Sequence, residues 1–202
     1  MAKLQNALAK KIPVWRDEIK ELNKVHGNVK IDTVNIGQAY GGMRGIKCMV
    51  CDTSEVPPDK GLLIRGIPVG ELTDKTAEDT FYLLCTGELP SAADRKALVE
   101  EFNARAKVPA YVWKVLEAMP KDSHPMTMLD TAILCMQRES EFAKAYHGLA
   151  KADYWKPTLE DSLNMLARIP VIAAGIYRLR FKKGPRIAPK KGLTMAQNYA
   201  RM

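Results

Sequence analysis

The feature that most constrains this fold is a helical spacing of apolar residues that recurs in one segment after another beyond Thr76. Two of these segments begin with a residue pair that is typical of a helix start: Thr76 with Asp79, and Ser91 with Asp94. Apolar residues then recur at intervals of three and four, which is the period of an amphipathic helix. The sequence therefore predicts a mainly α-helical protein.

Further helices are predicted along the chain, and two of them carry apolar residues on more than one face. These two span about 125–137 and 158–180, and Pro170 predicts a kink in the second. A surface helix of a monomer carries one apolar stripe, so we expect both helices to be covered on two sides. The other helices are expected over 3–11, from Pro13 to a stop at Gly27, and over 33–40, 76–87, 91–106, 109–120 and 193–202.

The only β signal lies near residues 46–66. Two short strands are predicted there, over about 46–52 and 61–66, because the intervening Val56–Gly61 holds two prolines and a glycine that favour a turn. Together the strands would form a small β-hairpin. The predicted fold class is thus a multi-helical domain with one small hairpin.

Cys48 and Cys51 form a CxxC pair within the first predicted strand. Residues three apart on a strand point to opposite faces, so the two sulfurs would neither converge on a metal ion nor form a disulfide. The sequence contains no second CxxC and no histidine pair that would complete a zinc site. We therefore predict no metal site, and we expect Cys85 and Cys135 to be small core residues of apolar helices.

The net charge of +8 indicates an anionic partner, and the charge alone fits either a nucleic acid or a phosphorylated cofactor. Much of it lies in residues 178–191, where Gly184, Pro185 and Pro189 favour a loop. No aromatic residues beyond Phe181 interleave with these basic residues, so a solvated loop fits better than a nucleic-acid patch. No apolar run reaches the length of a membrane-spanning helix.

Three glycines within five positions mark residues 40–47 (YGGMRGIK) as a tight turn rather than a helix interior. Arg44 lies between two of these glycines, and its planar guanidinium could bind a phosphate. The alternative is a turn that joins a short helix to a strand, with Arg44 paired to a surface carboxylate. Because the segment matches no named phosphate-binding loop, its spacing by itself favours this alternative.

A series of short motifs in a fixed order gives the chain a resemblance to a known family, the citrate synthases of mitochondria and some bacteria. The likeness covers essentially all 202 residues, and many ordered matches are far more specific than any single pattern. The matching segments are HGN at 26–28, YGGMRGIK at 40–47, DTS at 52–54, RGIP at 65–68, LL at 83–84, TG at 86–87, LP at 89–90, HPM at 124–126, ES at 139–140, FA at 142–143, YW at 154–155 and IYR at 176–178.

The resemblance implies a mainly α-helical homodimer that condenses acetyl-CoA with oxaloacetate and water to give citrate and CoA. Residues 1–202 would correspond to the N-terminal part of the large helical domain, with the small domain and the rest of the large domain outside this chain. The catalytic histidines and aspartate of the family also lie beyond it, and His26, His124 and His147 match none of them. The resemblance thus implies no catalytic residue in this chain, which we expect to be inactive by itself.

Two residues of this chain correspond to positions that bind CoA in the family. Arg44 matches the arginine of the glycine turn unchanged. Lys151 matches a basic residue that reaches the CoA phosphates from the partner subunit, where the best-known relatives carry arginine and one more residue precedes it. The resemblance implies acetyl-CoA and CoA as substrate and product, no permanently bound cofactor, and a homodimer contact through the helices near 125–137 and 158–180.

Three interpretations remain open: part of a citrate synthase, a non-catalytic relative that serves as a structural or docking subunit, and a basic nucleic-acid-binding helical domain. The family likeness argues against the third, so neither a nucleic acid nor a membrane is expected as a partner. The helical pattern that is still running at Met202 favours the first. The likeness begins almost at Met1 and leaves no room for a transit peptide, so we expect a bacterial cytoplasmic location, with the mitochondrial matrix as the alternative.

Overall fold

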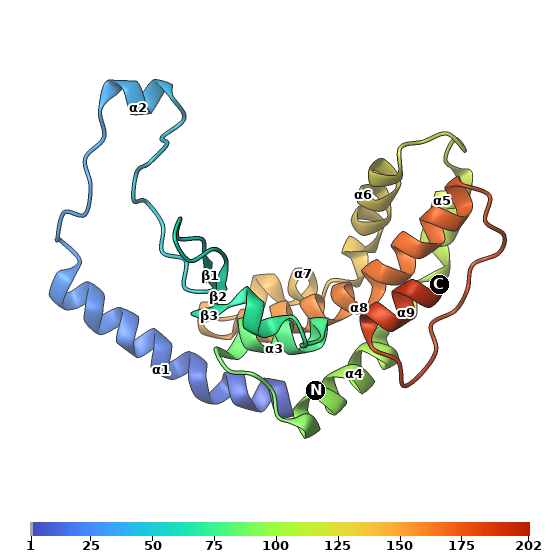
Figure 1. Cartoon of the computed structure of the whole chain (residues 1–202), viewed down its shortest axis with the longest axis horizontal. Coiled ribbons are helices and arrows are strands. Elements are labelled where there is room, and N and C mark those ends of the chain that lie inside the picture. Colours follow the sequence, from blue (N-terminus) through green and yellow to red (C-terminus); the bar gives the residue numbers. More distant parts are fainter. Residues whose placement is uncertain (1) are drawn as a thin grey trace. The chain divides into compact units, whose positions relative to one another are not determined.

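Helices dominate the structure, a computed structural model that describes residues 2–202. The mainly α-helical fold class predicted from the sequence is confirmed (Figure 1). The chain divides into two compact units. Unit 1 contains the residues up to Gln5, Thr76–Phe81 and Pro90–Met202, and unit 2 contains Asn6–Lys75 and Tyr82–Leu89.

Unit 1 consists of helices joined by short connections, and α4, α6 and α7 all pack against α8. The predicted start of α4 is confirmed, because Ser91 Oγ accepts a hydrogen bond from Asp94 N at 3.2 Å. The helices are α4 (Ala92–Arg105), α5 (Ala110–Ala118), α6 (Pro125–Cys135), α7 (Glu141–Ala145), α8 (Trp155–Arg180), α9 (Met195–Arg201) and the first half of α3 (Ala77–Thr86), with 3-10 turns at Met136–Glu139, Tyr146–Gly148 and Lys151–Asp153.

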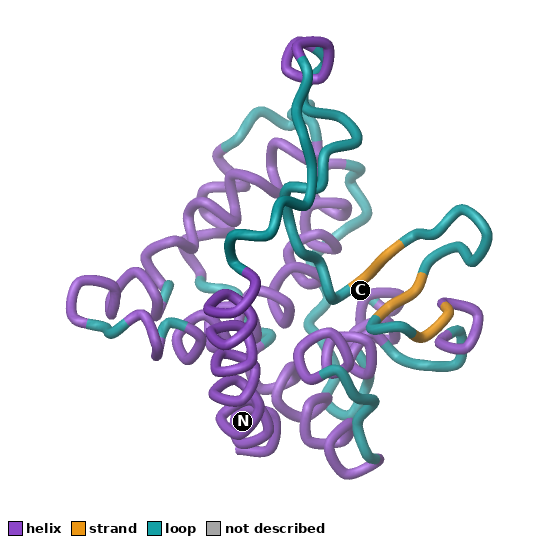
Figure 2. The backbone as a smooth tube through the Cα atoms, turned by 90° about the vertical axis from the view of Figure 1, so that its left-hand side faces the viewer, coloured by secondary structure: helices purple, strands orange, loops and turns teal. Residues whose placement is uncertain are grey.

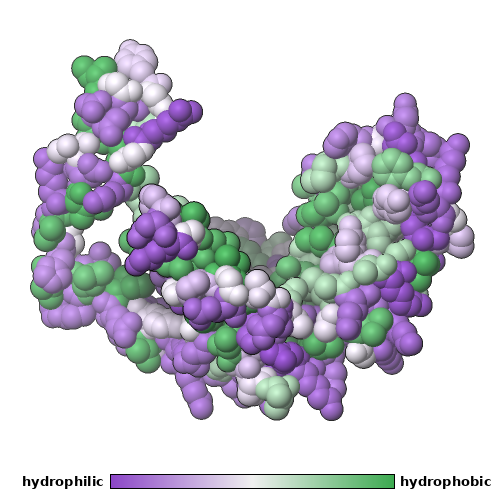
Figure 3. Space-filling model, in the orientation of Figure 1, coloured by the Kyte–Doolittle hydropathy of each residue, from purple (hydrophilic) through white to green (hydrophobic). Residues whose placement is uncertain are grey.

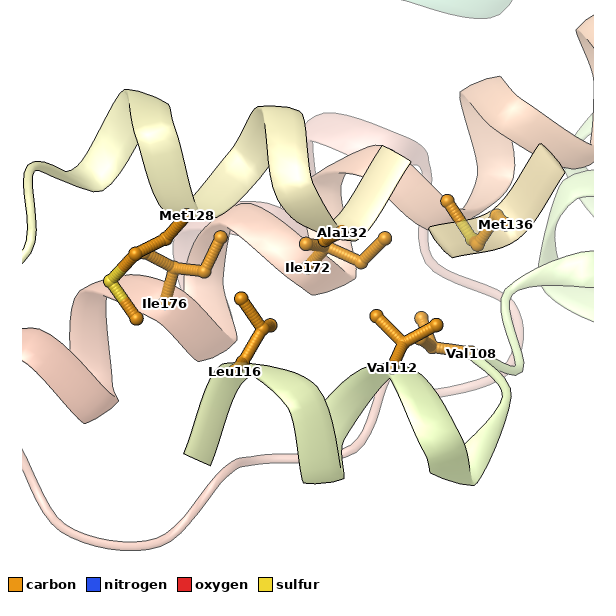
Figure 4. Close-up of a cluster of buried hydrophobic side chains, with 8 residues drawn as sticks. All are labelled: Val108, Val112, Leu116, Met128, Ala132, Met136, Ile172 and Ile176. Carbon is orange, nitrogen blue, oxygen red and sulfur yellow. The ribbon is translucent and has the colours of Figure 1, made fainter. Parts of the chain in front are cut away.

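The core of unit 1 lies where α5, α6 and α8 meet (Figure 4). Met128, Ala132 and Met136 recur at intervals of four and bury one face of α6 and of the turn that follows it. Leu134, on another face of α6, is 74% exposed, so this chain covers α6 on one side only. The buried side chains of the cluster are Val108, Val112, Leu116, Met128, Ala132, Met136, Ile172 and Ile176.

Most of α1 (Ala2–His26) belongs to unit 2, from Asn6 on. The helix runs through Pro13 without a break, so the predicted division into two helices is wrong. Proline lacks the N–H that would bond to the carbonyl of Ala9, but its fixed φ near −65° is compatible with a helix. The predicted stop at Gly27 is confirmed, because α1 ends at His26. Glycine is required at position 27, since a Cβ there would lie only 2.3 Å from the Asn23 carbonyl oxygen. α2 (Ile36–Tyr40), a 3-10 turn at Val69–Leu72 and the second half of α3 are the other helical elements of this unit.

Unit 2 also contains three short antiparallel strands, the only sheet among residues 2–202 (Figure 2). β1 (Ser54–Glu55) pairs with β2 (Leu63–Ile64), and β2 pairs with β3 (Ile67–Pro68). Arg65 and Gly66 form the turn between β2 and β3, and their φ angles of 50° and 79° match a type I′ turn.

The predicted strand over 46–52 is wrong, because that segment is neither strand nor helix. A strand requires a partner backbone, and β2 pairs with Ser54–Glu55 on one side and Ile67–Pro68 on the other. Residues 48–52 are all exposed, so no sheet face buries every second side chain there. The predicted hairpin near 46–66 is therefore replaced by a three-stranded sheet over 54–68, and residues 46–53 form a loop before it.

Candidate functional site

The glycine turn that follows α2 presents Arg44 to solvent. α2 begins with a capping box headed by Asn35, and the chain then turns sharply after the helix. Gly42, Met43 and Gly45 have positive φ angles of 78°, 60° and 76°. Glycine adopts such angles without strain, so Gly42 and Gly45 explain two of the three positive angles in the turn from which Arg44 extends, and Met43 adopts the third as a non-glycine residue.

Hydrogen bonds hold this turn in place and leave the guanidinium of Arg44 unoccupied. Gln38 Nε2 donates to the Arg44 carbonyl at 3.5 Å, and Lys47 N donates to Asp32 Oδ2 at 2.9 Å. Backbone hydrogen bonds from Lys47 and then from Thr33 lower the pKa of Asp32, which keeps that carboxylate charged. Among residues 2–202 no side chain binds the Arg44 guanidinium, so the predicted alternative of a pair with a surface carboxylate is not found.

Lys151 lies in unit 1, in the 3-10 turn Lys151–Asp153 between α7 and α8. Its side chain is exposed, and within the described part of the chain its ammonium group has no acidic partner. Its carbonyl accepts a hydrogen bond from Tyr154 N at 3.3 Å, which joins the turn to the start of α8. Arg44 belongs to unit 2, so the two predicted binding residues belong to different units.

An aromatic cluster that the sequence analysis missed lies close to the turn of Lys151. The ring centroids of Phe142, Tyr146 and Tyr154 are 5.2 to 5.9 Å apart, and His147 meets the Tyr146 ring edge-on at 5.5 Å. These distances are typical of stabilising aromatic pairs. Because Tyr146 is half exposed, the cluster adds an accessible aromatic surface to the segment that carries Lys151.

Asp161 of α8 caps the start of α7, the helix that carries Phe142 of the aromatic cluster. Its carboxylate accepts hydrogen bonds from Ser140 Oγ at 2.6 Å, Glu141 N at 2.7 Å and Phe142 N at 3.2 Å. A negative charge is favourable at a helix N-terminus, where backbone N–H groups lack helical partners. The sequence contains no sign of this contact, because Asp161 lies about 20 residues from the groups that it binds.

We expect Asp161→Asn to lower the free energy of unfolding by about 1.5–3 kcal/mol, the range for hydrogen bonds to a charged group. The amide would replace an accepting oxygen with a donating NH₂, which would face either the Glu141 N–H or both the Ser140 hydroxyl and the Phe142 N–H. Urea unfolding followed by circular dichroism measures the change. Asp130→Asn, at an exposed position of α6, is the matched control and should change stability by less than about 0.5 kcal/mol. Equal effects of the two substitutions would contradict the capping role.

Arg65, which belongs to one of the family motifs, forms hydrogen bonds that stabilise the fold. Its side chain is 15% exposed, and it donates from Nη2 and Nε to the Leu84 carbonyl at 2.7 and 3.1 Å. Its Nη1 also pairs with Asp52 Oδ2 at 2.7 Å. Arg65 therefore joins the sheet to the end of α3 within unit 2, and its guanidinium is already occupied.

The predicted loop over the basic segment 178–191 is confirmed for residues 181–191, whereas residues 178–180 still belong to α8. Three arginines of the segment make contacts inside unit 1, and one of them, Arg180, donates from Nε to the Ser123 carbonyl at 3.1 Å. The Arg186 guanidinium lies 4.5 Å from the centroid of the Trp113 ring and pairs with Glu117. A cavity of about 670 Å³ adjoins this loop, and neither Arg44 nor Lys151 lines it. Arg178 donates to the carbonyls of Lys183, Pro185 and Met202.

The described residues hold no group of three or more histidine, cysteine, aspartate or glutamate side chains that could bind a metal ion. Each histidine has an evident place in the fold: His26 ends α1, His147 meets Tyr146, and His124 Nδ1 caps α6 by accepting from Met126 N at 3.2 Å. Between residues 2 and 202, none of the helices has both the length and the apolar composition of a membrane span.

Comparison with known proteins points to a single family. A protein-family model described as "Citrate synthase, C-terminal domain" matches residues 42–202. The chain is 40% identical over 210 residues to the mitochondrial citrate synthase of Saccharomyces cerevisiae, a match that covers 98% of this chain and 44% of that protein. It is 35% identical over 210 residues to the mitochondrial citrate synthase 4 of Arabidopsis thaliana, again with 98% and 44% covered.

A solved structure also has the same fold. The chain matches the ternary complex of carboxymethyl coenzyme A and oxaloacetate with citrate synthase from Thermoplasma acidophilum with a TM-score of 0.66. The sequence identity is 19%, and the match covers 83% of this chain and 42% of that chain. The chain thus spans less than half the length of each of these relatives.

Proposed function

Because this chain belongs to the citrate synthase family, we propose that it forms part of an enzyme that condenses acetyl-CoA with oxaloacetate and water to give citrate and CoA. The observation that carries the proposal is the 40% identity with the yeast enzyme across 98% of the chain. The ligands named for the Thermoplasma acidophilum complex, a CoA derivative and oxaloacetate, support this choice of substrates. In this proposal residues 1–202 form the N-terminal part of the large helical domain.

In this enzyme Arg44 binds a phosphate of CoA. CoA carries a pyrophosphate and a 3′-phosphate, and a planar guanidinium can bind two phosphate oxygens at once. Two observations support the assignment: the Arg44 guanidinium is exposed, and none of the residues 2–202 occupies it.

Lys151 is proposed to reach the CoA phosphates of the neighbouring subunit. Its ammonium group is exposed and has no acidic partner among the described residues, which supports a role in binding an external anion. A lysine acts as a point charge and does not form the bidentate contact of an arginine, so its contribution should be smaller than that of Arg44. The capping bonds of Asp161 and the aromatic cluster hold the segment from which Lys151 extends.

The proposed enzyme is a homodimer that forms through α6 and α8. Met126 and Leu134 of α6 and Tyr177 of α8 are 55%, 74% and 52% exposed. Figure 3 shows hydrophobic side chains on the surface over α6. The buried faces of these helices already meet inside unit 1, so a second copy would cover the exposed apolar side chains.

We expect Leu134→Lys to dissociate the dimer of the complete polypeptide into monomers. A lysine at this position would place two ammonium groups near one another across a twofold contact and remove an apolar side chain from it. Analytical ultracentrifugation at micromolar concentration measures the mass. Val56→Lys, at a position that is 70% exposed in the loop before β2, is the control and should remain dimeric. A dimeric Leu134→Lys variant would refute the contact.

The catalytic test compares two lengths of polypeptide. We expect the purified 202-residue chain to release no CoA from acetyl-CoA and oxaloacetate, because the catalytic histidines and aspartate of the family lie outside it. A polypeptide of the length of the yeast relative, of which this chain covers 44%, should release CoA and form citrate. The alternative, a non-catalytic structural or docking subunit, requires that cells contain a 22.5 kDa product of this sequence, which an immunoblot would reveal.

The compartment is proposed from the relatives. The Saccharomyces and Arabidopsis proteins are both named as mitochondrial, which favours the mitochondrial matrix over the bacterial cytoplasm that we expected from the sequence. Detection of the native protein in the matrix fraction of purified mitochondria would support this location, and its absence from that fraction would contradict it.

A further inference from the structure

Cys48 and Cys51 lie in the loop that connects the Arg44 turn to β1, and neither has a role in the proposed reaction. Both side chains are exposed free thiols. On a strand, residues three apart would point to opposite faces and hold the two sulfurs apart, but the loop is not a strand. The physical argument against a bond between these two sulfurs is therefore removed.

The loop is held by hydrogen bonds near both ends. On one side Lys47 N donates to Asp32 Oδ2 at 2.9 Å, and on the other Arg65 N donates to the carbonyl of Thr53 at 2.9 Å. Within residues 2–202, the backbone groups of 48–51 take part in no hydrogen bond. Residues 48–51 can thus change their φ and ψ angles without breaking a hydrogen bond of a sheet or a helix. Such a change is needed because a disulfide bond has a specific geometry.

The two thiols are not equivalent. Cys51 Sγ lies 3.4 Å from Thr53 Oγ1 and 3.5 Å from the Ser54 carbonyl. The Thr53 hydroxyl, followed by the backbone of Ser54 and Thr53, lowers the pKa of the Cys51 thiol. Because the thiolate is the attacking species and the Thr53 hydroxyl can donate to it, this contact identifies Cys51 as the nucleophile of the pair and leaves Cys48 to complete the exchange.

We propose that Cys48 and Cys51 form a reversible dithiol–disulfide site that reacts with low-molecular-weight disulfides such as glutathione disulfide. The Cys51 thiolate attacks one sulfur of glutathione disulfide, breaks its S–S bond and releases one glutathione thiolate, which takes up a proton. Cys48 then loses its proton and attacks Cys51 Sγ, which releases the second glutathione. The two protein thiols are oxidised to one disulfide, and glutathione disulfide is reduced to two glutathione molecules.

Cys85 and Cys135 provide an internal contrast, because both are partly buried in helices. Burial raises the pKa of the Cys85 thiol to about 11, so this thiol remains almost entirely protonated near neutral pH. Cys135 packs against the buried cluster of unit 1. Neither thiol has an exposed partner cysteine at a CxxC spacing, so neither belongs to the proposed site.

The test treats the full 202-residue chain with glutathione disulfide near neutral pH, followed by alkylation of the remaining thiols and peptide mass analysis. We expect the wild-type chain to lose two hydrogens in the peptide that holds Cys48 and Cys51, with alkylation only at Cys85 and Cys135. Cys48→Ser should accumulate one glutathione on Cys51, because no second thiol can displace it. Cys51→Ser should form its glutathione adduct on Cys48 more slowly than Cys48→Ser forms the adduct on Cys51.

Dithiothreitol should restore all free thiols in each case, and circular dichroism should show unchanged helix content, since both cysteines are exposed. A wild-type chain that keeps a glutathione adduct on either cysteine, or that leaves both open to alkylation, would overturn the dithiol site. A faster reaction of Cys51→Ser than of Cys48→Ser would overturn the assignment of Cys51 as the attacking thiol. Because the test uses no enzymatic activity, its result is independent of the proposed condensation reaction.

Discussion

Asp79→Ala should lower the free energy of unfolding by about 1.5–3 kcal/mol, the range for hydrogen bonds to a charged group, because the Arg95 partner is 42% exposed and stays hydrated after the substitution. Asp79 is 0% exposed and accepts hydrogen bonds from Arg95 Nε at 2.6 Å, Thr76 N at 2.9 Å and Thr76 Oγ1 at 3.1 Å. The substitution removes the acceptor of all three bonds and leaves a cavity at the start of α3. Urea denaturation of the chain measures the loss.

A second capping pair in the same unit provides the matched control for this prediction. Asp94 follows the N-cap Ser91 of α4 just as Asp79 follows Thr76, but its side chain is 23% exposed and water can replace its partners. Asp94→Ala should therefore cost about 1 kcal/mol, as for an ordinary cap. If the two substitutions cost the same, burial and the pair with Arg95 contribute nothing beyond the cap.

The effect of Asp79 should also depend on pH. Burial alone would raise the pKa of this carboxyl, but the bonds from Arg95 and Thr76 outweigh burial and lower it. An aspartate with a lowered pKa stabilises the fold at every pH above its unfolded value of about 3.9, and the stabilisation is lost as the pH falls through the folded value. The stability difference between wild type and Asp79→Asn should thus be constant near neutral pH and shrink below about pH 4. A difference that does not shrink in acid would contradict the ionised pair.

Arg44→Ala should raise the KM for acetyl-CoA of the complete enzyme by about 10- to 100-fold, which corresponds to about 1.5–3 kcal/mol for a charge-assisted bond. The KM for oxaloacetate should hardly change, because oxaloacetate carries no phosphate. Steady-state kinetics with each substrate varied in turn measures the two constants. Arg44→Lys should lie between wild type and alanine, since a lysine retains the charge and loses the bidentate geometry.

Lys60→Ala serves as the control, because Lys60 is an exposed cation in the turn before β2 of the same unit. It should change neither KM by more than the error of the measurement. If Arg44→Ala raises both constants equally, or neither, Arg44 serves the fold of the turn and not the binding of CoA.

Local chemistry was sufficient wherever a helix begins or ends. Ser91 and Asp94 form their hydrogen bonds within three residues, and so do Thr76 and Asp79, so the short pattern already contains both partners. The turn at Arg44 is equally local, because Gly42 and Gly45 can adopt the positive φ angles that the turn needs. The family could be identified for a related reason: its motifs are short and keep their order along the chain.

Elements whose partners lie far away in the sequence could not be predicted. The segment 46–52 has a strand-like composition, but a strand exists only with a partner, and β2 pairs with other residues. The faces of α6 are another example, because apolar Met128 is buried while apolar Leu134 is exposed. Only the positions of α5 and α8 decide which of the two is covered.

The candidate site divides in the same way. The sequence alone identified Arg44 and Lys151 as cationic residues at family positions, but it could not show that both lack an acidic partner among residues 2–202. Nor could it find Asp161, which caps a helix about 20 residues before it, or the occupied guanidinium of Arg65. A hydrogen bond within one turn is encoded in neighbouring residues, whereas a bond between distant segments forms only after packing brings them together.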